Sequence, residues 1–263
     1  MTATATATAL GSRLILGTRV DATDYAAATR TVLAWARAGE SRMVCVATVH
    51  VVMEAHDDPA FRAAVNGADL VTSDGMPLVW GLRLLGIPGA TRVYGPDLTR
   101  AVLAAAAREG VPVGFHGGRP EVLRALVARV RSAHPGLEVA HAESPPFAEP
   151  TEERLAEEAE RIARSGARIV FVGLGCPKQE RWMAAQRGRI PVVMLGVGAA
   201  FDFLAGAKRQ APRWVQDAGL EWAFRLATEP RRLWRRYLVH NPRFVVLFGR
   251  QLLAERVKAG AAA

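Results

Sequence analysis

The chain has 263 residues, of which 50% are hydrophobic and 22% charged, and its formal net charge is +9. This length predicts one large α/β domain, alone or with an appendage, and the apolar content excludes an intrinsically disordered protein. Two cysteines, Cys45 and Cys176, are too few for a disulfide scaffold and favour free thiols in a reducing compartment. The positive charge indicates an anionic partner: a nucleic acid, an acidic membrane or a phosphorylated substrate.

No segment predicts a secretion signal or a membrane span. The longest apolar run, 191–201, has about half the length that a bilayer crossing needs, and Asp202 ends it. Residues 1–12 begin with alternating Ala and Thr and lack the basic and apolar regions of a signal peptide, so we expect a disordered tail. These features predict a cytoplasmic protein.

Short apolar runs alternate with helical patterns through residues 13–207. The runs are rich in Val, Ile and Phe, as buried parallel strands are. The expected strands are 43–47, 70–72, 112–115, 137–140, 169–172 and 191–195. The expected helices are 25–38, 59–66, 98–109, 120–134, 151–165 and 179–186. This alternation predicts a catalytic α/β domain with a Rossmann-like, mostly parallel sheet and helices on both faces. From residue 208 to 263 the pattern changes to Trp- and Arg-rich helix, which marks an appendage.

Two junctions between a strand and a helix are rich in glycine. At the first, Gly117 and Gly118 precede Pro120, and backbone amides there could bind a phosphate. A glycine turn without a ligand explains this junction equally well, and the full G-x-G-x-x-G fingerprint is absent. At the second, Gly173-Leu174-Gly175-Cys176-Pro177 precedes Lys178, Gln179 and Glu180. Polar residues at the carboxyl end of a buried strand are typical of a ligand site in an open α/β sheet.

Polar residues also follow the first two expected strands. Thr48 and His50 lie in the segment that we expect to end the first strand, and Asp74 follows the second beside a Gly-x-Pro turn. Asp74 is interpreted either as an Asx-turn or helix cap, or as a general base. Arg92 could offer a cation to a phosphate, and His50 could be a polar residue with no role in chemistry. Spacing alone does not decide among these interpretations.

Ordered motifs over residues 43–240 carry a family resemblance. They are ADLVTSDGMP at 68–77, RVYGPD at 92–97, GLGCPKQE at 173–180, GVGAAFDF at 196–203, GLEW at 219–222 and EPRRLWRRYL at 229–238. In this order they strongly resemble the WecG/TagA/CpsF glycosyltransferase family.

The resemblance implies an inverting, metal-independent transfer from a UDP-sugar to a polyprenyl-diphosphate-linked sugar, without a cofactor. The sugar transferred is N-acetylmannosamine, its uronic acid or a hexose, in the synthesis of cell-surface polysaccharide. The sequence has no Asp-x-Asp motif of the kind that binds a metal–nucleotide complex. A soluble secondary-metabolite acceptor is the alternative, and a basic nucleic-acid-binding protein is a less favoured one. The oligomeric state stays open, and a homo-oligomer is compatible with the sequence.

Transferred position by position, the resemblance makes Asp74 the catalytic base, with Thr48 on the first active-site strand and Arg92 stabilising the diphosphate leaving group. His50 stands where the family commonly has Asn. The residues expected to bind substrate are His50, Gly117, Gly118, Gln179, Glu180, Asp202, Arg232 and Arg235.

The appendage carries almost all of the excess charge. Residues 208–258 contain twelve Lys or Arg and four Asp or Glu, which is +8 of the total +9. Arginines with interleaved aromatics fit a solvated helical pair, a nucleic-acid surface or a membrane surface. A lipid-linked acceptor requires contact with a bilayer. We therefore expect the appendage to associate with the inner face of the cell membrane rather than with nucleic acid.

Overall fold

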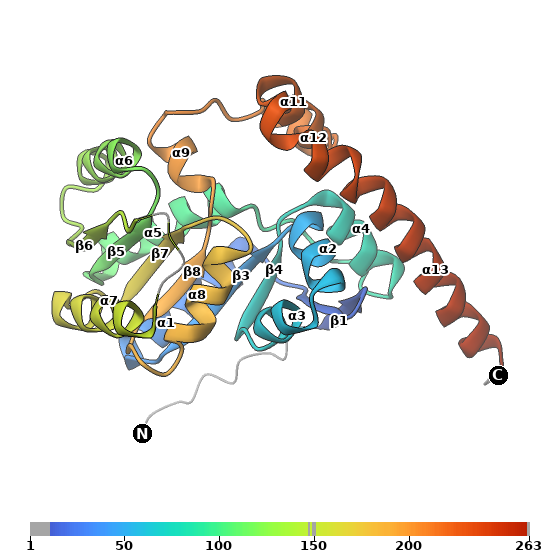
Figure 1. The fold of residues 1–263 in the computed structure, drawn as a ribbon, viewed down its shortest axis with the longest axis horizontal. Helices are drawn as coiled ribbons and strands as arrows, with labels where there is room; N and C mark the ends of the chain where they lie inside the picture. Colours follow the sequence, from blue (N-terminus) through green and yellow to red (C-terminus); the bar gives the residue numbers. More distant parts are fainter. Residues whose placement is uncertain (1–10, 147, 149–150, 262–263) are drawn as a thin grey trace.

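The computed structural model describes residues 11–146, 148 and 151–261 (Figure 1). At its centre is a six-stranded sheet in the order β4-β3-β8-β7-β5-β6, in which every neighbouring pair is parallel. The strands are β3 (Arg42–Ala47), β4 (Leu70–Ser73), β5 (Val113–Gly117), β6 (Val139–Glu143), β7 (Ile169–Gly173) and β8 (Val193–Gly196). The predicted α/β fold is confirmed.

Helices cover both faces of the sheet and create two cores. Side chains of β7 alternate between them: Phe171 belongs to one, and Val170 and Val172 belong to the other. The first core is closed by α1 (Tyr25–Ala38), α5 (Gly95–Glu109), α6 (Pro120–Ala133) and α9 (Ala200–Leu204). The second is closed by α2 (Val49–Asp57), α3 (Pro59–Asn66), α4 (Met76–Leu84), α7 (Glu152–Ser165) and α8 (Lys178–Gln186).

Several elements of the structure were not predicted from the sequence pattern, among them the short helix α9. The expected continuation of the first strand through His50 was wrong, because β3 ends at Ala47 and α2 begins at Val49. Thr48 is the N-cap of α2, and its hydroxyl accepts a hydrogen bond from the backbone N–H of Val51. The run of β-branched residues in α2 resembles a strand, and burial against the sheet overrides that propensity. Helix α4 was likewise not predicted.

The antiparallel hairpin of β1 (Ser12–Ile15) and β2 (Thr18–Asp21) was also not predicted. Its turn uses Leu16 and Gly17, both with positive φ. The predicted tail, residues 1–12, lies outside the described residues except for its last two, and Ser12 begins β1.

The described part of the C-terminal segment is mostly helical. It comprises α10 (Arg213–Asp217), α11 (Glu221–Thr228), α12 (Pro230–Leu238) and α13 (His240–Ala261). Helix α13 packs on α2, and its Phe244 and Phe248 are buried in the second core. Gln251 accepts a hydrogen bond from the backbone N–H of Leu16 and donates one to the carbonyl of Leu14. The appendage is therefore packed into the same core as the sheet.

Candidate functional site

A cleft of about 1350 Å³ opens at the carboxyl ends of the parallel strands. Loops after β3, β4, β5, β7 and β8 line it, and α12 forms a further wall. This is the edge at which open α/β sheets bind ligands. The cleft gathers most of the residues predicted from sequence: Thr48, His50, Asp74, Gly118, Gln179, Asp202, Arg232 and Arg235.

Asp74 lies in the cleft directly after β4. Its backbone N–H bonds to the carbonyl of Ala47 at 2.9 Å, which fixes the loop to the neighbouring strand. Its carboxylate accepts a hydrogen bond from the N–H of Gly95 at 3.3 Å. Helix α4 has Gly75 as its N-cap and no side-chain cap, so Asp74 does not cap the helix that follows it in sequence.

Arg92 connects Asp74 to the C-terminal segment. Its Nη2 lies 3.3 Å from Oδ1 of Asp74 and 2.5 Å from Oε2 of Glu221, which begins α11. The Arg92 Nε also donates to the Asp74 carbonyl, and the guanidinium stacks over the ring of Tyr94 at 4.2 Å. Arg92 contacts a small side pocket next to Asp74 and does not line the main cleft. Glu221 was not predicted as a site residue, although it stands in the GLEW motif.

The carboxyl group of Asp74 has an unusual pKa. Burial raises this pKa to about 6, while the positive charge of Arg92 opposes the rise and Glu221 adds to it. A carboxylate with this pKa is ionised at neutral pH and is more basic than an exposed aspartate. These are the properties of a general base matched to neutral conditions.

Two arginines of the C-terminal segment enter the cleft without a carboxylate partner. Arg236 of α12 donates from Nη2 to the hydroxyl of Thr48 at 3.1 Å, and Arg225 of α11 places its guanidinium over Phe203. Among the described residues, neither makes an ion pair with Asp or Glu, and Nε of Arg225 is buried without a hydrogen-bond partner. Burial lowers the pKa of Arg236. Partly buried, unpaired cations favour an anionic ligand.

Arg236 was recognised in the arginine-rich helix but was not predicted to be a site residue. Arg232 and Arg235, which were chosen instead, are exposed at the cleft edge, and Arg232 pairs with Glu229. The deciding signal was available in the sequence: Arg236 stands beside Tyr237 and one turn from Leu233, the two buried residues of α12. The apolar stripe of a helix identifies which arginine faces inward.

Glycines bring two of the loops into close contact. Gly117 has φ 115°, and a Cβ on it would lie 2.7 Å from the carbonyl carbon of Gly173. The next residue, Gly118, donates its N–H to the carbonyl of Gly173 at 3.1 Å and lines the cleft. Gly117 itself does not line the cleft, because it packs against the neighbouring loop, and its role in substrate binding stays a prediction.

Gln179 and Glu180 have different positions at the start of α8. Gln179 lines the cleft, accepts a hydrogen bond from the N–H of Gly175 at 3.2 Å and donates to Glu180 at 2.8 Å. Glu180 is fully buried behind it and does not line the cleft, so its predicted part in substrate binding stays a prediction. Burial raises the pKa of the Glu180 carboxyl.

Burial also raises the pKa of the Cys176 thiol. A thiol with a raised pKa is a poor nucleophile, so we interpret Cys176 as a small side chain that fills space.

Asp202, from α9, faces Lys208 across the cleft wall. Nζ of Lys208 lies 3.4 Å from the Asp202 carboxylate and 3.0 Å from that of Glu229. This bridge connects the end of the sheet domain to the start of α12. The cleft is therefore assembled from both parts of the chain.

The sequence pattern of the Glycosyl transferase WecG/TagA/CpsF family matches residues 13–258 of the 263. The chain belongs to this family. The match extends through α11 and α12 and into α13, so the C-terminal segment that completes the cleft is part of the family's shared sequence. A WecG/TagA/CpsF glycosyltransferase needs a site for an activated sugar, and the cleft combines a basic carboxylate, unpaired arginines and glycine-rich loops at one sheet edge.

Proposed function

We propose that the chain transfers a sugar from a UDP-sugar to a polyprenyl-diphosphate-linked sugar acceptor, with inversion at the anomeric carbon. The observation that carries this proposal is the arrangement of Asp74, a carboxylate with a raised pKa, in one cleft with the unpaired Arg225 and Arg236. The carboxylate suits a base, and the arginines suit a diphosphate.

In this reaction an acceptor hydroxyl attacks the anomeric carbon while the bond from that carbon to the UDP oxygen breaks. Asp74 takes the proton of the hydroxyl, and UDP leaves with the bonding electrons. Because attack comes from the face opposite to UDP, the anomeric configuration inverts. The hydrogen bond from Gly95 and the ion pair with Arg92 hold the carboxylate in position.

The charge that develops on UDP requires stabilisation. We assign this role to Arg236 and Arg225. Arg92 was predicted for the same role, but its guanidinium is engaged by Asp74 and Glu221. We therefore propose that Arg92 holds Asp74 in place and reaches the leaving group only through it.

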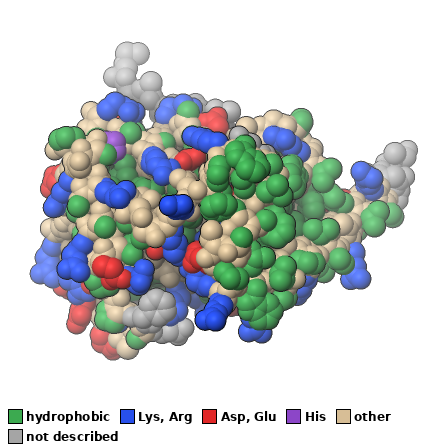
Figure 2. Space-filling view, turned by 90° about the horizontal axis from the view of Figure 1, so that it is seen from above, with side chains coloured by type: hydrophobic (Ala, Val, Ile, Leu, Met, Phe, Trp, Pro, Cys, Tyr) green, Lys and Arg blue, Asp and Glu red, His purple; other side chains and the backbone are tan. Residues whose placement is uncertain are grey.

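A lipid-linked acceptor fits the surface of the C-terminal segment. Figure 2 shows a broad apolar surface on the side where α13 lies in Figure 1, bordered by Lys and Arg. Exposed apolar residues of this segment include Trp214, Leu220, Trp222, Trp234, Leu238, Val239, Val245 and Val246. No helix within the described residues is long and apolar enough to cross a bilayer. Apolar side chains bordered by arginines support peripheral binding to an anionic membrane from the cytoplasmic side.

The decisive experiment measures UDP release from a panel of UDP-sugars, with a polyprenyl-diphosphate sugar, with a soluble sugar acceptor, or with neither. We expect rapid release with one donor only when the lipid-linked acceptor is present. Equal release with the soluble acceptor supports a role in the synthesis of a secondary metabolite. Absence of release with every donor and acceptor would contradict the proposal.

A further inference from the structure

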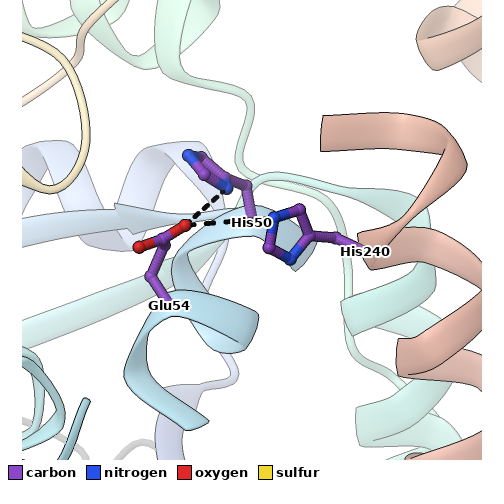
Figure 3. Close-up of side chains that lie close together, drawn as sticks. All are labelled: His50, Glu54 and His240. Atoms are coloured by element: carbon purple, nitrogen blue, oxygen red, sulfur yellow. Dashed lines mark ion pairs between the residues drawn. The ribbon is translucent and has the colours of Figure 1, made fainter. Parts of the chain in front are cut away.

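Two histidines and a glutamate converge where the C-terminal segment meets α2. His50 and Glu54 lie one turn apart on α2, and His240 is the first residue of α13 (Figure 3). Nδ1 of His50 lies 3.6 Å from Oε1 of Glu54, and Nε2 of His240 lies 4.0 Å from the same oxygen. The two imidazole rings meet edge to face, with centroids 5.4 Å apart.

The polar atoms of this cluster lack ordinary partners. Nδ1 of His50, the atom that faces Glu54, is buried and makes no hydrogen bond. Within the described part of the chain, the ion pairs of Glu54 are these two contacts with histidine, and neither is short enough to be a hydrogen bond. Buried polar atoms without partners are uncommon in folded proteins, and each calls for an explanation.

We propose that His50, Glu54 and His240 bind a divalent transition-metal ion such as Zn²⁺. One donor atom from each residue lies within 4.8 Å of the donor atoms of the other two. A tetrahedral Zn²⁺ with bonds of about 2.1 Å needs donor atoms roughly 3.4 Å apart. Two of the observed separations, 3.6 and 4.0 Å, approach this value, so small side-chain rotations complete the site. Two imidazoles and one carboxylate are a donor set that Zn²⁺ favours.

The fourth coordination position faces the cleft, since His50 and His240 both line it. Water or an anion can occupy this position. Arg236 lies close enough to influence His50 electrostatically, and its positive charge opposes a cation there. The carboxylate of Glu54 offsets part of that repulsion. Because of Arg236, we expect a weaker site than a fully enclosed structural zinc centre.

A second group, His116, His141 and Glu143, has comparable spacing but different surroundings. Both carboxylate oxygens of Glu143 are bound by Arg161, at 3.2 and 2.8 Å. His116 is completely buried between Trp182 and His141. A cation there competes with an arginine already in place, so we assign the ion to His50, Glu54 and His240.

The ion would tie α2 to the first residue of α13, which lies two positions after α12, the helix that carries Arg236. Its role is to hold the C-terminal segment on the sheet domain, and no step of the sugar transfer passes through it. In sequence, Glu54 and His240 are at least four positions from any residue to which we assign a role in the reaction. Metal binding can therefore be measured whether or not the proposed transfer is correct.

To test this proposal, the full chain is first freed of metal by chelation and then titrated with Zn²⁺ in a calorimeter. We expect one ion per chain, and affinity at least about 100-fold weaker in Glu54→Gln and in His240→Asn, because each loses one of three ligands. His56→Asn, on the same helix outside the cluster, and His141→Asn, in the second group, should bind as the wild type does. Zn²⁺ should also raise the midpoint temperature of thermal unfolding in the wild type, and raise it far less in Glu54→Gln and His240→Asn.

X-ray absorption of the Zn²⁺-loaded wild type keeps the test independent of variant folding. It should show two imidazoles and a carboxylate around the ion. Absence of stoichiometric binding, unchanged affinity in both ligand variants, or loss of binding only in His141→Asn would overturn the proposal. Sulfur in the coordination shell would overturn it as well.

Discussion

The guanidinium of Arg236 donates a hydrogen bond to the hydroxyl of Thr48, across 188 positions of sequence. Thr48 caps the helix that follows strand β3, and Arg236 comes from the C-terminal helix α12. The contact brings a cation of the appendage to the edge of the sheet. The cleft is complete only when the C-terminal segment is docked.

Replacing Arg236 by Ala should lower kcat/KM for sugar transfer by about 10²–10³-fold, the usual effect of removing one group that stabilises developing negative charge. Steady-state UDP release measures it. The matched control is Arg231→Ala, because Arg231 is exposed on the same helix and does not line the cleft. A rate in Arg236→Ala equal to that of this control would show that the leaving group is stabilised elsewhere.

Asp74→Asn should reduce turnover by about 10²–10⁴-fold, because an amide does not accept the proton. The affinity for UDP, measured by calorimetry, should stay within a few-fold of wild type, since the arginines remain. The variant keeps the shape of the side chain and its contact with Gly95. Near-normal turnover would remove Asp74 from the role of base.

The rate of sugar transfer should also depend on pH, because Asp74 acts as a base only when its carboxyl group is ionised. Its carboxyl pKa is raised to about 6, so kcat/KM should fall below about pH 6, by about tenfold per pH unit. A pH–rate profile with donor below saturation measures this. A profile that stays flat down to pH 4.5 would be inconsistent with Asp74 acting as the base.

The raised pKa of Asp74 also makes the free energy of unfolding depend on pH in a definite direction. A raised pKa means that the folded protein holds the Asp74 proton more tightly than the unfolded chain, so its contribution is present below about pH 4 and is lost as the pH rises through about 6. The free energy of unfolding of the wild type, relative to Asp74→Asn, should therefore decrease from pH 4 to pH 7. Urea titrations at several pH values give this difference.

Gly117→Ala should lower the free energy of unfolding by about 1–3 kcal/mol. The alanine would be strained at this positive φ, and its Cβ would lie too close to the loop after β7. Gly136→Ala is the control, since a Cβ there meets no atom within 4 Å. Urea unfolding compares the two. Equal stability of both variants would show that the two loops separate easily.

The proposed membrane contact can be tested without deleting the appendage, whose Phe244 and Phe248 are part of the core. Replacing Trp214, Trp234 and Leu238 by Ser should weaken sedimentation with phosphatidylglycerol liposomes by more than about tenfold, since three exposed apolar side chains are lost. Phosphatidylcholine liposomes are the control for charge. Failure of the wild type to bind anionic liposomes would exclude this surface as a membrane site.

Local sequence patterns predicted the buried strands and the helices between them, because burial on both faces leaves continuous apolar runs such as Ile169–Val172. They failed at α2, whose β-branched residues resemble a strand, and at the β1–β2 hairpin, whose Leu16-Gly17 turn is unusual. Asp74 and Gln179 were located by their place after buried strands. Glu221 and Arg236 were missed as site residues because their partners, Arg92 and Thr48, are more than 100 positions away.

The position of β8 has a consequence for biosynthesis. In the sheet, β8 alone connects the pair β4–β3 to the trio β7–β5–β6, although it is the last of the six strands to be made. A nascent chain that has not yet reached residue 193 therefore holds two separate groups of strands, each with an unpaired edge at the place that β8 will occupy. Because exposed edges promote aggregation, we expect the nascent chain to be most prone to aggregation before β8 emerges.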